Sequence, residues 1–266
     1  GHGQEIHTGE EAGIAGWLEA LQSKHATSDW KVYTPPRFAN AFPGKSVIEY
    51  PELDLNHTLR SKQAEHLHMW VQHLLDGRFA EASAFAQKIW LQNFPIFVTR
   101  NLDEAKQYVT SRFEGEVSKR YGILASSKDR ILPEYGIPNG FQDTKRVKNA
   151  KWYNEDLGTP GSCCNMQEVV TEFGCQGLEL DMAIVAWGND FMWSGNNWEL
   201  RKMRTRIPQV DPHQLRLNSY RVLLTRSREG IIVFIPPKPE FDATEHAFLA
   251  AGARLLDSRI PLAEIS

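Results

Sequence analysis

Short apolar segments recur along the chain at intervals that leave room for a helix, and this pattern constrains the fold more than any other feature. Residues 95–99 (PIFVT) and 121–125 (YGILA) enclose a more polar, helix-like stretch. Such a strand–helix–strand succession is typical of a βαβ unit, whose strands are parallel and whose helix covers the sheet. Residues 181–187 (DMAIVAW) and 231–235 (IIVFI) are further apolar runs of strand length. We therefore predict an α/β fold, a mostly parallel sheet with helices on both faces.

The segment that precedes these strands has the pattern of two helices. Residues 59–91 form a predicted helical hairpin with a break at 76–77 (DG). In its first arm, Leu67, Val71 and Leu74 are spaced to face inward. Weaker patterns indicate a helix at 14–21, strands at 31–33, 47–50 and 168–171, a turn at 174–177, a final helix at 244–256 and a polar surface insertion at 126–165.

Two further helices are expected between the apolar strands. Asn101 or Asp103 is placed to cap a helix that runs to about Lys119. Residues 213–228 are also helical by pattern, and Gly230 fits the position just after the end of that helix.

The sequence lacks the marks of membrane and secreted proteins. No apolar run approaches the ~18 residues of a spanning helix, and the first residues lack the basic and apolar regions of a signal peptide. Cys163, Cys164 and Cys175 form neither a disulfide framework nor a zinc pattern. We expect no membrane association and a reducing, cytoplasmic location.

Charge is distributed unevenly although the whole chain has a net charge of only −3. Residues 201–228 carry eight Lys or Arg and one acid, Asp211, which gives a local net charge of +7. Such a run is either a solvated basic face or a site for phosphate or nucleic acid. Composition leaves both interpretations open.

Several catalytic motifs are excluded. Residues 43–46 (PGKS) end like a phosphate loop, but position 39 is Ala where the motif needs Gly, and a strand-like segment follows. His66, His68 and His73 lack the spacing of convergent zinc ligands, so no metal site is predicted. No Gly-x-Ser-x-Gly segment supports a hydrolase triad.

Two segments carry a resemblance to known enzymes. Residues 171–181 (TEFGCQGLELD) resemble motif V of superfamily 1 helicases, and residues 220–230 (YRVLLTRSREG) resemble motif VI. From Glu179 in the first segment to Arg226 in the second, the spacing is 47 residues.

Two shorter matches lie upstream. Residues 1–6 (GHGQEI) resemble motif III, and residues 55–61 (LNHTLRS) resemble motif IV. The sequences of all four segments are similar to the Schlafen group 3-type DNA/RNA helicase domain. The resemblance implies a three-layer RecA-like fold of the phosphate-loop NTPase type and identifies the chain as a second helicase lobe. Residues 1–50 would then be a leading segment that ends the first lobe, and residues 51–266 the second lobe. The first lobe, with its phosphate loop and Mg²⁺-binding acidic motif, is expected in the same polypeptide.

The resemblance also implies roles in ATP hydrolysis. Arg226 would be the arginine finger, Arg60 a second γ-phosphate contact and Gln4 a γ-phosphate sensor. Glu179 would accept a hydrogen bond from the ribose. The residues implied to bind the nucleotide are Gln176, Gly177, Glu179 and Arg226. ATP with Mg²⁺ is expected only in the complete two-lobe protein.

Single-stranded DNA or RNA is the implied partner, held through phosphates and stacked bases. The candidate contacts are Thr171, Glu172 and Phe173 by family position, and Ser126 and Ser127 at the end of a predicted parallel strand. Trp193, Trp198 and residues 201–206 form either an aromatic, basic contact loop or a packed surface loop.

The sequence thus favours the second lobe of an ATP-dependent superfamily 1 helicase or translocase, inactive as an isolated chain. The alternative is a non-enzymatic module that binds nucleic acid or protein and retains the fold of the lobe.

Overall fold

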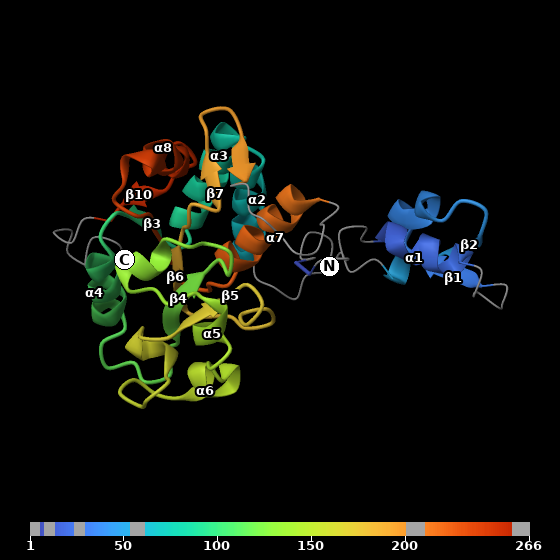
Figure 1. Cartoon of the computed structure of the whole chain (residues 1–266). Helices are drawn as coiled ribbons and strands as arrows, with labels where there is room; N and C mark the ends of the chain where they lie inside the picture. Colours follow the sequence, from blue (N-terminus) through green and yellow to red (C-terminus); the bar gives the residue numbers. More distant parts are fainter. Residues whose placement is uncertain (1–5, 8–13, 24–29, 54–61, 201–210, 257–266) are drawn as a thin grey trace.

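The computed structural model describes residues 6–7, 14–23, 30–53, 62–200 and 211–256. The predictions for Gln4, Arg60 and residues 201–206 lie outside these described residues. Figure 1 shows a central sheet with helices packed around it and a smaller group of short elements from the first part of the chain.

Six parallel strands form the central sheet, in the order β10-β3-β9-β6-β4-β5. The strands are β3 (Ile96–Thr99), β4 (Tyr121–Ala125), β5 (Val169–Thr171), β6 (Met182–Ala186), β9 (Ile231–Phe234) and β10 (Arg254–Leu255). Every residue of β3, β4, β6 and β9 is buried. Continuous apolar sequence is what such doubly covered strands require, and the predicted α/β fold, consistent with a RecA-like fold, is confirmed.

Helices cover both faces of the sheet. They are α2 (Lys62–Leu75), α3 (Phe79–Trp90), α4 (Leu102–Arg112), α5 (Phe141–Thr144), α6 (Asn149–Asn154), α7 (Pro212–Leu224) and α8 (Asp242–Ala250). The connections through α4, α5 and α6 step toward β5, whereas those through α7 and α8 step toward β10. Because crossovers between parallel strands are right-handed, opposite steps place their helices on opposite faces. The α2–α3 pair packs against α7 and α8 (Figure 1).

The helical hairpin is confirmed. The chain turns at Gly77, whose φ of +73° is a conformation that glycine adopts without strain. Leu67, Val71 and Leu74 are buried as predicted. The indole of Trp70 donates to the carbonyl of Ala251 at 2.9 Å, which ties the hairpin to the end of α8.

The helix after β3 is shorter than predicted. It ends at Arg112 rather than near Lys119, and Gly115 then continues the chain with φ of +80°. Asn101 is the capping residue, since its side-chain oxygen accepts from the backbone N–H groups of Asp103 and Glu104. Gly115, which lies before the predicted end at Lys119, was the available signal in the sequence for an earlier end.

The helix α7 also ends earlier than predicted, and this changes the position of two arginines. α7 ends at Leu224, so Arg226 and Arg228 follow the helix instead of lying on it. The prediction that Gly230 ends the helix is wrong. A Cβ at Gly230 would lie 2.9 Å from the ring of Pro95, so glycine is needed there for close packing.

The end of the described chain differs from the prediction as well. A helix was expected over residues 244–256, but α8 ends at Ala250 and Arg254–Leu255 add β10 to the edge of the sheet. Earlier in the chain, β7 (Phe191–Trp193) and β8 (Trp198–Leu200) form an antiparallel hairpin. Trp198 is buried, and its indole donates to the carbonyl of Leu74 at 2.9 Å, so this tryptophan packs in the interior.

The predicted domain boundaries stay predictions, because the structure does not test them. Two segments of the chain are nevertheless described. Residues 126–165 are more ordered than their polar composition indicates, because they form α5 and α6 and bury Leu132, Ile137 and Trp152. Nearer the start of the chain, α1 (Ile14–Gln22) accompanies a parallel pair, β1 (Lys31–Thr34) and β2 (Ser46–Glu49). The strand β2 begins at Ser46, so no helix follows the PGKS segment.

Candidate functional site

The segments that resemble motifs V and VI lie side by side, although 47 residues separate Glu179 from Arg226. Leu180 donates its N–H to the carbonyl of Arg226 at 2.7 Å, and Arg228 donates back to Leu180 at 2.9 Å. A parallel bridge between Leu180 and Ser227 results. The chain must leave α7 at Leu224 to make this bridge, which explains why the helix ends early.

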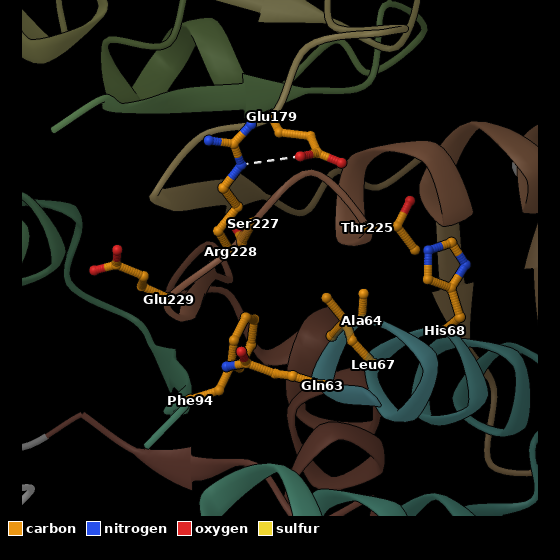
Figure 2. Close-up of a pocket in the computed structure, with 10 residues that line it drawn as sticks. All are labelled: Gln63, Ala64, Leu67, His68, Phe94, Glu179, Thr225, Ser227, Arg228 and Glu229. Carbon is orange, nitrogen blue, oxygen red and sulfur yellow. Dashed lines mark hydrogen bonds and ion pairs between the residues drawn. The ribbon is translucent and has the colours of Figure 1, made fainter. Parts of the chain in front are cut away.

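A cavity of about 380 Å³ opens beside this bridge (Figure 2). One wall is the first turns of α2, and the other wall is the pair of bridged segments. Its lining residues are Gln63, Ala64, Leu67, His68, Phe94, Glu179, Thr225, Ser227, Arg228 and Glu229. The cavity thus combines residues from both motif-like segments with the helix that directly follows the motif IV-like segment.

Glu179 and Arg228 form an ion pair at the mouth of this cavity, with Nε 2.9 Å from Oε2. Both side chains are partly exposed, at 35% for Glu179 and 55% for Arg228. The hydrogen bond to Glu179 raises the pKa of the Arg228 guanidinium above its ordinary value. Tyr153 supports the segment, since its hydroxyl donates to the Glu179 carbonyl at 2.8 Å.

Arg226 is not among the residues that line the cavity, and it is buried, with 4% of its surface exposed. Its guanidinium donates to the carbonyl of Val222 at 3.0 Å, to the carbonyl of Leu178 at 3.4 Å and to the hydroxyl of Thr225 at 3.1 Å. It therefore joins the end of α7 to the motif V-like turn. Within that turn, Gly177 has a φ of +87° and Gln176 is exposed.

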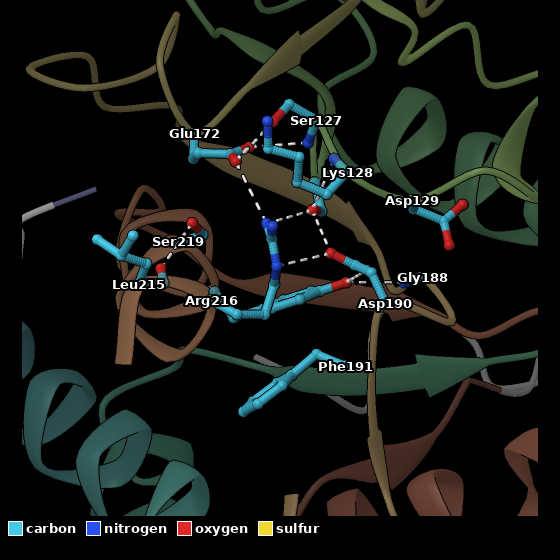
Figure 3. Close-up of polar contacts among 12 residues, drawn as sticks. Ser127, Lys128, Asp129, Glu172, Gly188, Asp190, Phe191, Leu215, Arg216 and Ser219 are labelled. Atoms are coloured by element: carbon cyan, nitrogen blue, oxygen red, sulfur yellow. Dashed lines mark hydrogen bonds and ion pairs between the residues drawn. The ribbon is translucent and has the colours of Figure 1, made fainter. Parts of the chain in front are cut away.

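A second polar cluster lies at the carboxyl ends of β4, β5 and β6 (Figure 3). Its centre is Arg216 on α7, whose Nε lies 3.0 Å from Asp190 Oδ2 and whose Nη1 lies 3.5 Å from Glu172 Oε1. Arg216 also donates to the hydroxyl of Ser126 at 3.0 Å. Glu172 accepts from the backbone N–H and the hydroxyl of Ser127, both at 2.9 Å.

Tyr220 and Asp129 lie beside this cluster, and burial shifts the pKa values of both side chains. Burial, with Asp190 and Asp129 close by, raises the pKa of Tyr220 well above its ordinary value, and its hydroxyl donates to Asp190 at 2.6 Å. Burial likewise raises the pKa of Asp129, although its carboxylate accepts from the backbone of Ile131, Leu132 and Asn189. An unpaired charge in the protein interior is energetically unfavourable, so the loss of one charged member would destabilise the position of its partners.

The structure divides the predicted nucleic-acid residues into two groups. Ser126 and Glu172 are fully buried and belong to the polar cluster. Ser127, Thr171 and Phe173 line an open groove of about 560 Å³ between β5 and α5.

Arg216 and Asp190 were not singled out from the sequence. Arg216 was counted in the basic run at 201–228, yet its side chain is 9% exposed and ion-paired. The run is therefore not one solvated face, because Arg216 and Arg226 are both buried. The apolar residues Leu215 and Leu217, which flank Arg216 in the sequence, were the available signal.

Among the described residues, no cluster of His, Cys, Asp or Glu side chains is arranged to hold a metal ion. No helix in the described ranges has both the length and the apolar character that crossing a membrane requires.

Comparison with known proteins places these features in a family. Residues 1–237 match the family described as Schlafen group 3, DNA/RNA helicase domain. No curated protein and no solved structure matches the chain. Since the family match covers most of the chain, this helicase-type domain belongs to the Schlafen group 3 DNA/RNA helicase domain family.

Proposed function

We propose that the chain is the second RecA-like lobe of an ATP-dependent superfamily 1 helicase or translocase. The observation that carries the proposal is the convergence of the two motif-like segments on one cavity. Glu179 comes from the first segment and Thr225, Ser227 and Arg228 come from the second. Membership in a helicase-domain family supports the same function.

The lining of the cavity suits a nucleotide. The first described turn of α2 contributes Gln63, whose side-chain amide can donate a hydrogen bond to a phosphate oxygen. Arg228 adds a cation on the opposite wall, and Glu179 offers an acceptor for a ribose hydroxyl. These are the groups that a sugar and its phosphates require.

In the proposed cycle, a first lobe in the same polypeptide holds the phosphates and Mg²⁺, and this lobe supplies charge from across the cleft. Phosphoryl transfer depends mainly on positioning and electrostatic stabilisation. ATP competes with Arg228 for Glu179, so nucleotide binding opens the ion pair at the mouth of the cavity. Arg226 acts as the arginine finger after its guanidinium leaves the carbonyls of Val222 and Leu178.

ATPase measurements on two forms of the protein test this proposal. Residues 1–266 alone should show negligible turnover, whereas the two-lobe polypeptide should hydrolyse ATP in the presence of single-stranded nucleic acid. Arg226→Ala in the two-lobe form should lower kcat by about 10³- to 10⁵-fold. Arg78→Ala is the matched control, because Arg78 is an exposed arginine in the turn between α2 and α3.

Two results would contradict the proposal. Ordinary ATP turnover by residues 1–266 would show that no first lobe is needed. A parent reading frame without a phosphate loop in the roughly 200 residues before Gly1, about one lobe, would instead favour the non-enzymatic binding module.

A further inference from the structure

The groove between β5 and α5 has a lining that the proposed nucleotide cavity does not share. Its lining residues are Ser127, Lys128, Phe141, Thr144, Lys145, Val147, Asn149, Val170, Thr171, Phe173 and Gly174. Among these described residues, two are lysines and none is acidic. One wall comes from the end of β4 and the turn after β5, and the other from α5 and the loop that follows it. The polar segment 126–165 therefore contributes seven of the eleven described lining residues.

Two aromatic side chains in the groove are exposed. Phe141, the first residue of α5, is 71% exposed, and Phe173, two residues after β5, is 40% exposed. Exposed phenylalanines on opposite walls offer flat apolar faces to a ligand that enters between them. The ring of His7 contacts Phe173 at 5.0 Å between ring centroids, which helps to fix the position of that ring.

The lysines place positive charge next to these rings. Lys128 and Lys145 are exposed, and the Lys145 ammonium lies 5.7 Å from the centroid of the Phe141 ring. Glu172, which precedes Phe173 in the sequence, is buried and ion-paired with Arg216. None of the described lining residues of the groove carries a carboxylate that would repel an anion.

We propose that Phe141 and Lys145, with Phe173 and Lys128 on the facing wall, hold single-stranded nucleic acid by stacking an unpaired base between the rings and pairing its phosphates with the lysines. The inference rests on the proposed function and extends it to a segment outside the motif-like sequences. Stacking requires an exposed base face, so duplexes are excluded, and it tolerates every base. Free anions and acidic peptides match the lysines but leave the two rings without a partner.

The base of the groove is closely packed at Gly174. A Cβ at Gly174 would lie 2.7 Å from Val170 Cγ1 and 3.2 Å from Asn149 Oδ1, so the turn after β5 packs directly on the strand and on the start of α6. The two walls are thus held together by a close contact.

Fluorescence anisotropy with the whole chain tests the proposal. The probes are labelled single strands of oligo-dT and oligo-U of about 12 nucleotides, and the duplex of the same length. Phe141→Ala should weaken single-strand binding by roughly 5- to 150-fold, the usual effect of losing one stacked base. Phe141→Trp should restore it. Lys145→Gln should lower the slope of log affinity against log salt by about 0.7.

Matched controls remove the same chemistry elsewhere. Leu91→Ala deletes an apolar side chain that is 86% exposed, and Lys88→Gln removes an exposed lysine of α3. Both should bind like the unmodified chain. Phe141 is exposed, so its replacement should leave the circular dichroism melting curve unchanged, and a 2-aminopurine base in the probe should be quenched by the unmodified chain but not by Phe141→Ala.

The outcomes separate the two proposals. If the unmodified chain binds no single strand, the proposed function fails and the groove fails with it. If the chain binds single strands but Phe141→Ala and Lys145→Gln bind equally well, only the groove is wrong. Equal binding of the duplex, or equal competition by poly-glutamate, would also overturn base stacking as the mode of recognition.

Discussion

The carboxylate of Glu172 lies 3.5 Å from the guanidinium of Arg216, and this ion pair joins the turn after β5 to α7. The same turn contributes Phe173 to the groove. The same helix ends just before Thr225, which lines the proposed nucleotide cavity. The two candidate sites are therefore connected through a buried ion pair. A shift of the turn after β5 has a direct path to the segment that carries Arg226.

We predict that Arg216→Met strongly destabilises the domain. The Arg216 side chain is 9% exposed, and both carboxylate partners, Glu172 and Asp190, are 1% exposed. Removal of one member of a buried ion pair leaves uncompensated charge and costs about 3–5 kcal/mol. Urea unfolding should show this as a lower midpoint.

The control for this prediction is an exposed ion pair. Lys238 lies 2.8 Å from Glu134, and both side chains are solvated. Lys238→Ala should unfold like the unmodified chain, since exposed pairs contribute little. A midpoint for Arg216→Met that equals this control would show that the cluster does not depend on Arg216.

Arg226 and Arg228 should differ in what their loss does to stability. Arg226→Ala should lower the free energy of unfolding by about 1–3 kcal/mol, because the buried carbonyl of Val222 and the partly buried carbonyl of Leu178 lose a donor. Arg228→Ala breaks only an exposed pair with Glu179 and should cost about 0–1 kcal/mol. Equal losses in the two variants would contradict the buried position of Arg226.

The central strands could be predicted from sequence because each is continuously apolar over four or five residues and is covered on both faces. The strand β10 could not, since Arg254 and Leu255 are both exposed and pair only along β3. The end of α7 was also hidden. Residues 225–228 are acceptable in a helix, and only the pairing of Ser227 with Leu180, far away in sequence, takes them out of it.

The candidate sites were predictable to different degrees. Glu179, Arg226 and Arg228 were found because the sequences around them resemble known motifs. The polar cluster was not found, because Arg216, Asp190 and Ser126 come from three separate segments with no common pattern. Phe141 was missed for a similar reason, since its role depends on the contact between α5 and β5.

The pH dependence of stability should report on Asp129. Burial raises the pKa of this carboxyl above its ordinary value of 3.8, so the folded protein binds the proton more tightly than the unfolded chain. Its contribution to stability therefore falls as pH rises from the unfolded pKa through the folded pKa, and recovers as pH is lowered.

Asp129→Asn removes this titration. The free energy of unfolding of the unmodified chain, measured relative to Asp129→Asn, should increase when the pH is lowered from about 7 to about 4.5. Urea titrations of both proteins at the two pH values give this difference. A difference that stays constant, or that decreases on acidification, would show that burial does not control the ionisation of Asp129.

Gly188 should tolerate no side chain, for a reason that differs from that at Gly177. A Cβ at Gly188 would lie 2.4 Å from Asp129 Cβ, and the Gly188 N–H donates to the hydroxyl of Tyr220 at 3.0 Å. Gly188→Ala should therefore cost roughly 1–3 kcal/mol by overpacking and alter the near-ultraviolet circular dichroism of the Tyr220 region. At Gly177 nothing lies within 4 Å, so Gly177→Ala adds only the strain of a φ of +87°, about 1–2 kcal/mol, with an unchanged spectrum. An unaltered spectrum for Gly188→Ala would contradict the close packing of Gly188 against Asp129 and Tyr220.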